Sequence, residues 1–186
     1  MTTPTATGHR RDLSDGTYCE WTRTFHAPIE DVWAAVTEPQ RLARWLGTWT
    51  GDPATGEVTF QMLFEDDMPA EGFRIDECEA PHRLRITTSM PTDGEDPESW
   101  QLRLDLTEAA GITTLTFAQN LPDPTMAENV GPGWDYYLDR LVAAEAGRDP
   151  ATVRFDDYYP ALSEYYRTEF GGTNETPGAR TDQLKG

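Results

Sequence analysis

The segment of residues 25–47, FHAPIEDVWAAVTEPQRLARWLG, constrains the fold of this chain most, because it predicts two helices too short to be stable alone. Pro28 fits the first turn of a helix, where its missing N–H costs nothing. Pro39 ends this first helix and begins a second, for which Gly47 is a natural C-terminal cap. Each helix carries an apolar stripe, made by Val32, Trp33 and Val36 in the first and by Leu42, Trp45 and Leu46 in the second. Both helices must therefore pack against a larger structure.

Six segments alternate apolar and polar residues with the period of two that a half-buried strand requires. They are GTYCEWTRTF (16–25), EVTFQMLFED (57–66), GFRIDECE (72–79), LRITTSM (84–90), SWQLRLDLTE (99–108) and ITTLTFAQNL (112–121). A bend inside residues 57–66 would make seven strands. Short turns join most neighbouring segments, which favours an antiparallel meander with one covered face.

Arg23 interrupts the apolar face of residues 16–25, which Cys19, Trp21 and Phe25 otherwise form. Its side chain either lies at the rim of the sheet or points its charge inward. We favour the rim, because an unpaired buried guanidinium is very costly.

Residues 124–147 predict the long helix that covers this sheet. Its apolar stripe has helical spacing and consists of Trp134, Tyr137, Leu138, Leu141 and Val142. Pro132 and Gly133 predict a kink or a late start of this helix.

The two ends of the chain differ from the predicted domain of residues 15–147. Residues 1–14 and 171–186 are polar and aperiodic and are expected to be disordered. Residues 148–170 predict an extension with an aromatic helical stripe, made by Tyr158, Tyr159, Leu162, Tyr165, Tyr166 and Phe170. This short helix either docks on the outside of the domain or binds a partner, for instance a second copy in a homodimer.

The formal net charge of −18 argues against nucleic acid or an anionic membrane surface as a partner. No apolar run reaches the length of a transmembrane helix, and the N-terminus lacks the apolar core of a signal peptide, so we expect a cytoplasmic protein. Cys19 and Cys78 lack CxxC spacing and are expected to be buried thiols, although a disulfide between them stays open.

The sequence carries no recognisable catalytic or metal-binding motif. His9, His26 and His82 are not spaced as metal ligands, and neither a P-loop nor a GxSxG motif is found. We therefore expect no metal and no cofactor. The acidic run at residues 65–67 is expected to be a solvated loop.

Four segments in one order carry a resemblance to a known family. They are residues 25–47, GFRIDECEAPHRLRIT, SWQLRLDLTEAAGITTLTFAQNL and GWDYYLDRL, and together they lie within residues 18–145. They resemble the SRPBCC superfamily, in the branch named after the activator of the heat-shock protein 90 ATPase. The resemblance implies an α+β helix-grip, or START-like, fold: a curved antiparallel sheet of six or seven strands, two short helices, and a long C-terminal helix over a cavity.

The resemblance also implies that this cavity is a deep apolar pocket for a small lipophilic molecule. The residues predicted to line it are Trp21, Phe60, Met62, Phe64, Phe73, Ile75, Leu84, Ile86, Leu102, Leu104, Leu115, Phe117, Trp134, Tyr137 and Leu141. For any single one of them, plain core packing without ligand contact is favoured over a place in the wall of a ligand site. Trp33 and Trp45 are expected to be scaffold that packs one end of the sheet, away from any chemistry.

Three functions follow from this interpretation. The first is binding of a small hydrophobic ligand, lipid-like or polyketide-like. The second is an enzyme of the cyclase or hydrolase type in the same cavity, with Arg23, Arg74, Asp135 and Tyr137 as candidate catalytic residues. The third is a co-chaperone-like interaction protein, as the branch name suggests. Binding is favoured over catalysis, because the fold that the resemblance implies mostly hosts binding and a catalytic role does not follow from the fold alone.

Overall fold

The computed structural model describes residues 3–65, 68–90 and 98–171. One antiparallel sheet of eight strands, in the order β1-β2-β8-β7-β6-β5-β4-β3, forms the body of the protein. The strands are β1 (His9–Leu13), β2 (Gly16–Phe25), β3 (Gly47–Thr50), β4 (Glu57–Met62), β5 (Glu71–Glu79), β6 (Arg83–Met90), β7 (Glu98–Ala109) and β8 (Ile112–Asn120). The predicted α+β class and the curved antiparallel sheet are confirmed.

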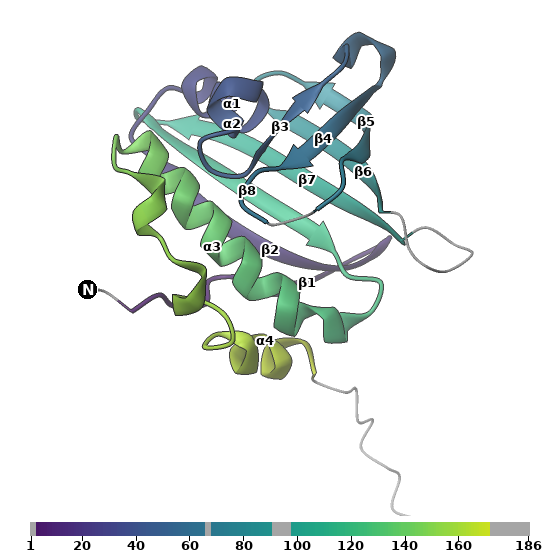
Figure 1. The fold of residues 1–186 in the computed structure, drawn as a ribbon, viewed down its shortest axis with the longest axis vertical. Helices are drawn as coiled ribbons and strands as arrows, with labels where there is room; N and C mark the ends of the chain where they lie inside the picture. The colour runs from purple at the N-terminus through teal and green to yellow at the C-terminus, as the bar shows by residue number, and fades with distance from the viewer. Residues whose placement is uncertain (1–2, 66–67, 91–97, 172–186) are drawn as a thin grey trace, which may run out of the picture.

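Four α-helices accompany the sheet in the described part of the chain. They are α1 (Ile29–Thr37), α2 (Pro39–Leu42), α3 (Ala127–Glu145) and α4 (Ser163–Phe170). Short 3-10 turns precede β4, α3 and α4, at Pro53–Thr55, Pro124–Met126, Pro150–Thr152 and Phe155–Asp157. The long helix α3 lies across the concave side of the sheet near β2, and α1 and α2 lie over one end of the strands (Figure 1). None of the described helices combines the length and the apolar character needed to span a bilayer.

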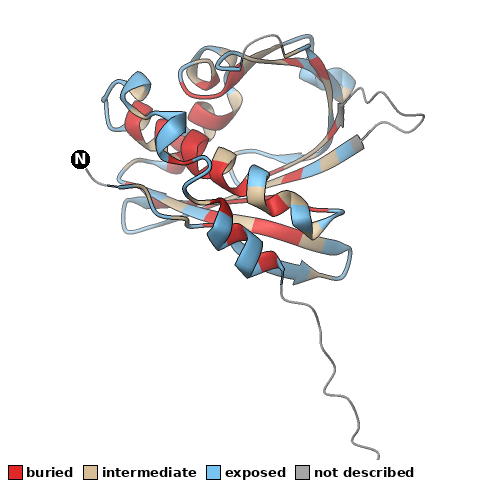
Figure 2. Cartoon of the chain, turned by 60° about the horizontal axis from the view of Figure 1, so that its bottom comes forward, coloured by how far each residue is buried: buried red, intermediate tan, exposed pale blue. Residues whose placement is uncertain are grey.

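The strand order explains why the two short helices are needed. Strand β2 pairs with β8, whereas β3, the next strand in the chain, lies at the opposite edge of the sheet. The chain must therefore cross from one end of the curved sheet to the other between Phe25 and Gly47, and α1 and α2 make that crossing. Figure 2 shows the strands bending into an open arch with these helices at one end.

Two of the eight strands were not predicted. Residues 9–13, expected to be disordered, form β1 and pair with β2 from His9 opposite Glu20 to Leu13 opposite Gly16. This strand is polar and lies at the edge of the sheet, where backbone hydrogen bonds hold it. Its sequence therefore shows no alternation of apolar and polar residues that could reveal it. The expected tail of residues 171–186 lies outside the described residues, apart from Gly171.

The second unpredicted strand, β3, corrects the expectation that Gly47 caps a helix. Gly47 is buried at the first position of β3, and a Cβ there would overlap the carbonyl oxygen of Gln61 on β4. Glycine is therefore required by the close approach of two strands. Strand β4 in turn ends at Met62, so the predicted strand of residues 57–66 extends too far, and its last residue lies outside the described residues.

A β-bulge in β5 changes which side chains face the helix. The register with β6 shifts between Ile75 and Glu77, so that Cys78 comes opposite Leu84 on the inner face. Strict alternation from Phe73 and Ile75 would place Cys78 on the outer face instead. Both cysteines are free, and Cys78 is exposed at the end of the strand, so the expectation of two buried thiols is wrong for Cys78.

The helix α3 runs without a break from Ala127, so the late start predicted at Pro132 is not found; Pro132 lies inside the helix. The aromatic segment that follows packs back on the domain. Tyr166 and Phe170 of α4 are buried, and α4 contacts α3. The use of α4 in a homodimer stays a prediction, for which Tyr159 and Tyr165 are the exposed aromatic side chains of the stripe.

Candidate ligand pocket

The space between the curved sheet and α3 contains a pocket with two adjoining chambers. The first chamber has a volume of about 470 Å³ and the second a volume of about 320 Å³. Five residues belong to the walls of both chambers: Leu46, Phe60, Phe73, Leu102 and Trp134. Because these shared residues come from the segment after α2, from β4, β5 and β7, and from α3, the two chambers meet in the middle of the domain.

The first chamber is apolar on nearly every side. Inward side chains of β4 to β8 form one wall, among them Ile75, Leu84 and Leu104. The segment from α1 to β3 forms the opposite wall with three tryptophans: Trp33, Trp45 and Trp49. The indole N–H groups of Trp45 and Trp49 donate to the carbonyls of Ala35 (2.9 Å) and Thr37 (2.8 Å), so both rings contribute apolar surface only.

The second chamber carries hydrogen-bonding groups in addition to apolar ones. Trp134 Nε1 donates to Gln119 Oε1 over 2.6 Å, and Tyr137 Oη donates to Glu65 Oε1 over 2.9 Å. Glu71 and Thr88 also line this chamber and are buried. The second chamber is therefore the part of the pocket that can recognise a polar group.

Two acidic groups of the second chamber are perturbed by their surroundings. Burial, reinforced by the nearby Glu65 carboxylate, raises the pKa of Glu71 above its ordinary value. Burial, followed by the charge of Glu65 and the hydrogen bond to it, raises the pKa of Tyr137. The Tyr137 phenol therefore stays protonated at neutral pH and acts as a hydrogen-bond donor, not as a phenolate base.

The structure brings most of the predicted ligand-binding residues together. Those that line one or both chambers are Phe60, Met62, Phe73, Ile75, Leu84, Ile86, Leu102, Leu104, Leu115, Phe117, Trp134 and Tyr137. They share the inner face of the sheet or the facing side of α3, as period-two and helical spacing predicted.

Three predicted residues do not line either chamber. Trp21 is fully buried in the core beside Phe117, and its Nε1 donates to Tyr166 Oη over 3.0 Å. Leu141 is fully buried farther along α3. Phe64 lies past the end of β4, half-exposed, with its ring centroid 3.8 Å from the guanidinium carbon of Arg140. For Phe64 the prediction failed because the alternation was extended beyond the strand.

Sequence reasoning missed the wall contributed by α1, α2 and β3. Trp33 and Trp45, expected to be scaffold, line the first chamber together with Trp49, Val36 and Leu42. The apolar stripes of these helices were visible in the sequence, but nothing in the sequence showed that the stripes face an open space. Gln119 and Thr88 were also missed, although period-two alternation places Gln119 on the same face as Leu115 and Phe117.

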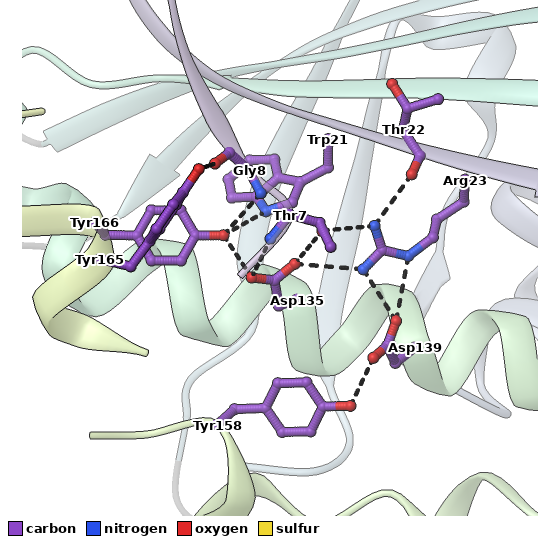
Figure 3. A network of polar contacts seen from close by, with 10 residues as sticks. All are labelled: Thr7, Gly8, Trp21, Thr22, Arg23, Asp135, Asp139, Tyr158, Tyr165 and Tyr166. Carbon is purple, nitrogen blue, oxygen red and sulfur yellow. Dashed lines mark hydrogen bonds and ion pairs between the residues drawn. The ribbon is translucent and has the colours of Figure 1, made fainter. Parts of the chain in front are cut away.

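Three of the four candidate catalytic residues lie away from the pocket. Arg74 is exposed and donates to Asp76 Oδ1 over 2.6 Å. Arg23 and Asp135 belong to a polar network on the other side of α3, which Figure 3 shows. Tyr137 is the remaining candidate, and it lines the second chamber.

Asp135 is the centre of that polar network and is fully buried. Its carboxylate accepts from Thr7 N (3.2 Å), Thr7 Oγ1 (2.5 Å), Tyr166 Oη (2.5 Å) and Arg23 Nη2 (3.3 Å). Burial raises the pKa of Asp135, and the hydrogen bonds from Thr7 and Tyr166 together with the charge of Arg23 oppose that rise. The network therefore joins α3 to the N-terminal segment, to β2 and to α4 (Figure 3).

Arg23 corrects the expectation of a residue at the rim of the sheet. Its side chain is only 10% exposed and pairs with both Asp135 and Asp139, whose Oδ1 lies 3.0 Å from Arg23 Nη2. Tyr158 Oη donates to the second oxygen of Asp139 over 2.7 Å. The cost of burying the guanidinium is offset because both partners are present, which the sequence could not show.

Comparison with known proteins identifies the family. Residues 26–145 match the family described as activator of Hsp90 ATPase homolog 1-like protein. The chain belongs to this family. The resemblance stated from the sequence is thus confirmed, and so is the helix-grip fold. Among curated proteins, none matches the chain.

Solved structures of similar proteins agree with the family's fold. CalU16 from Micromonospora echinospora is 23% identical, with a TM-score of 0.64, over 89% of this chain and 97% of that one. DynU16, from the dynemicin biosynthetic locus, is 27% identical, with a TM-score of 0.60, over 72% of this chain and 49% of that one. EF2215 from Enterococcus faecalis, a protein of unknown function, is 18% identical, with a TM-score of 0.64, over 88% of this chain and 90% of that one.

Proposed function

We propose that this protein binds a small hydrophobic molecule, lipid-like or polyketide-like, in the two-chamber pocket. The observation that carries the proposal is the unfilled volume of about 470 Å³ behind a nearly continuous apolar wall. Protein interiors normally pack with few voids larger than a water molecule, whereas ligand pockets measure roughly 300–1,000 Å³. A cavity of this size inside an otherwise well-buried core is better explained by a ligand than by packing.

The comparisons support the same class of ligand. DynU16 belongs to a biosynthetic locus, which agrees with a role in handling a small molecule. The apolar wall favours a ligand whose body is largely hydrocarbon or aromatic, because burying apolar surface provides about 25 cal/mol per Å². The tryptophans Trp33, Trp45 and Trp49 supply flat faces on which an aromatic or polyene body can stack.

A catalytic role is the second candidate, and one observation favours it. Tyr137 and Glu65 form a hydrogen-bonded pair in the wall of the second chamber, which Glu71 also lines. A protonated phenol beside carboxyl groups can polarise a carbonyl in a cyclase-type or hydrolase-type reaction. Under this alternative, Tyr137→Phe abolishes turnover of a bound substrate while binding survives; unchanged turnover would remove Tyr137 from the reaction.

Binding is tested by blocking the pocket. Leu102 lines both chambers, so Leu102→Trp places an indole where the ligand must lie. Leu63→Trp is the matched control, because Leu63 is 47% exposed and lines neither chamber. The wild type and Leu63→Trp should retain co-purified ligand in native mass spectrometry and show thermal shifts with members of a lipid and polyketide panel, and Leu102→Trp should lose both. A wild type without co-purified ligand and without any shift would contradict the proposal.

A further inference from the structure

The amide of Gln119 is held in one orientation and leaves its nitrogen without a partner. Gln119 lies on β8, and its Oε1 accepts the Trp134 indole hydrogen over 2.6 Å. Because an indole nitrogen can only donate, this bond fixes which end of the amide is oxygen. The other end, Nε2, is buried and has no hydrogen-bond partner among the described residues.

An unpaired buried amide nitrogen is costly. Leaving such a donor unsatisfied costs about 1–3 kcal/mol, and most buried polar groups in native proteins are paired. The side chain of Gln119 is 0% exposed, so bulk water does not satisfy the nitrogen. Gln119 lines the second chamber, so a group bound there becomes its partner once the side chains that cover the amide shift.

The charges around the second chamber restrict what that group can be. No Arg, Lys or His of the described residues lines either chamber. Two carboxyl groups, those of Glu65 and Glu71, do line the second chamber. An anionic group bound there would meet this negative charge in a poorly solvated site, without a cationic side chain in the described part of the chamber wall to pair with. A cationic group could not accept a hydrogen bond and would leave the Gln119 nitrogen unpaired.

These observations indicate a ligand with two parts: a large apolar part, the body, and a smaller polar group, the head. The first chamber is larger and apolar and fits the body, and the shared wall of Leu102, Phe60 and Trp134 leads into the second chamber. We propose that the second chamber recognises an uncharged hydrogen-bond acceptor on the ligand, such as the carbonyl oxygen of a ketone, ester or amide, through Gln119 Nε2. This inference rests on the proposed function and specifies its ligand: a neutral carbonyl compound, in place of a fatty-acid carboxylate.

A small movement of the wall brings the ligand atom to Gln119. The amide is fully covered in the structure, so a carbonyl oxygen reaches Nε2 only after neighbouring side chains shift. The second chamber includes Met62 and Met68, whose unbranched side chains adapt easily to a new shape. The bond to Trp134 meanwhile keeps the amide plane in place.

Three probes with one body and different heads test the inference. They are 2-acetylanthracene, which carries a ketone, 2-ethylanthracene, which carries no polar group, and anthracene-2-carboxylate, which has nearly the shape of the ketone but a negative charge. Affinities are measured by energy transfer from the pocket tryptophans to the anthracene ring. The wild type should bind the ketone at least tenfold more tightly than the carboxylate.

The decisive variant is Gln119→Met, which keeps the length of the side chain and removes the amide donor. The ratio of ketone to ethyl affinity should fall about tenfold, the effect expected for one buried hydrogen bond. Gln101→Met is the matched control: Gln101 is exposed on the neighbouring strand β7 and also accepts from an aromatic residue, Tyr18. Its ratio should equal that of the wild type. Gln119→Leu, which also lacks a hydrogen-bond donor, replaces Gln119→Met if the latter does not fold.

The outcomes separate this inference from the proposed function. If ketone and ethyl probes both bind and the ratio is the same in the wild type and in Gln119→Met, the pocket binds ligands but the inference is wrong. The inference is equally wrong if the carboxylate binds as tightly as the ketone. If none of the three probes binds the wild type, the inference is wrong, and the proposed function falls with it only where native mass spectrometry and the lipid and polyketide panel are negative as well.

Discussion

The two sides of α3 have opposite character, although their residues alternate along one helix. Trp134, Tyr137 and Leu138 face the pocket, where a large volume is left unfilled. Asp135 and Asp139 face the other way and are held by hydrogen bonds to Thr7, Arg23, Tyr158 and Tyr166 (Figure 3). The apolar side therefore borders a cavity, whereas the carboxylates on the polar side are held by hydrogen-bond partners.

This difference separates stability from function. The polar side ties together segments far apart in the sequence, so its groups have partners and little freedom. The pocket side leaves volume empty and one amide nitrogen unpaired, which lowers stability. Such a loss of stability is expected at a site that is kept for binding. We therefore expect substitutions on the polar side to affect folding, and substitutions on the pocket side to affect binding.

The largest effect is expected at Asp135. Asp135→Ala removes the partner of Thr7 and Tyr166 and leaves the buried Arg23 with Asp139 as its one carboxylate partner among the described residues. Unfolding in urea should therefore show a loss of about 3–5 kcal/mol. Asp139→Ala is the milder comparison, because the Asp139 side chain is 38% exposed. A loss below about 1 kcal/mol for Asp135→Ala would show that the network does not hold the fold.

Two leucines of β7 that face the same way should differ in how they tolerate a larger side chain. Leu106 is 1% exposed and lines neither chamber, so Leu106→Trp should overpack the core and destabilise the protein by about 1–3 kcal/mol. Leu102→Trp should cost less than about 1 kcal/mol, because the indole enters empty space. Thermal unfolding of both variants measures the contrast. Equal losses would mean that the pocket is not available to a side chain.

Replacing either of two glycines of α3 by alanine should change the stability of the protein, in opposite directions. A Cβ on Gly131 would overlap the ring of Tyr166, so Gly131→Ala should destabilise the protein by about 1–2 kcal/mol through displacement of α4. Gly133 has open space around it, so Gly133→Ala should stabilise the helix by up to about 1 kcal/mol. Chemical denaturation gives both values; a destabilising Gly133→Ala would contradict the open space seen beside it.

The smallest expected effect is the pH dependence that Glu71 adds to the stability of the protein. Burial raises the pKa of Glu71 above its ordinary value of 4.5, so the folded protein binds this proton more tightly than the unfolded chain does. The resulting stability is complete below that ordinary value and is lost as the pH rises through the folded pKa. Glu71→Gln does not titrate, so its unfolding midpoint should rise relative to the wild type between pH 4 and pH 7.

An acidic group with the opposite shift provides the control for that measurement. The hydrogen bonds from Thr125 lower the pKa of Asp123, so its stabilising contribution is present at neutral pH and is lost as the pH falls. Asp123→Asn should therefore be less stable than the wild type at pH 7, with a gap that closes on acidification. As the pH rises, the stability relative to the wild type should increase for Glu71→Gln and decrease for Asp123→Asn. If both variants changed in the same direction, the burial of a charge at Glu71 would be contradicted.

Local patterns were enough to predict most of the sheet and the parts of the pocket wall that the sheet and α3 contribute. Alternation in β7 placed Leu102 and Leu104 on the inner face, and helical spacing placed Trp134 and Tyr137 beside each other on α3. Alternation failed where the backbone departs from a regular strand, at the bulge before Cys78 and beyond Met62. It also could not find β1, whose pairing with β2 depends on backbone groups that every residue carries.

The sequence by itself determined most strands and helices and the side chains that face the core, because these follow from periodicity and from local backbone preferences. The resemblance of its motifs to a known family supplied the class of fold and the family. Only the tertiary structure decided which of those side chains border empty space, since a void depends on the distance between elements that meet from distant parts of the chain. It likewise decided the role of residues 25–47: they cross the open end of the sheet, and their tryptophans line the pocket. The tertiary structure also decided two polar details. It brings Asp135 next to Arg23, and it places no hydrogen-bond partner from the described residues at the Gln119 nitrogen.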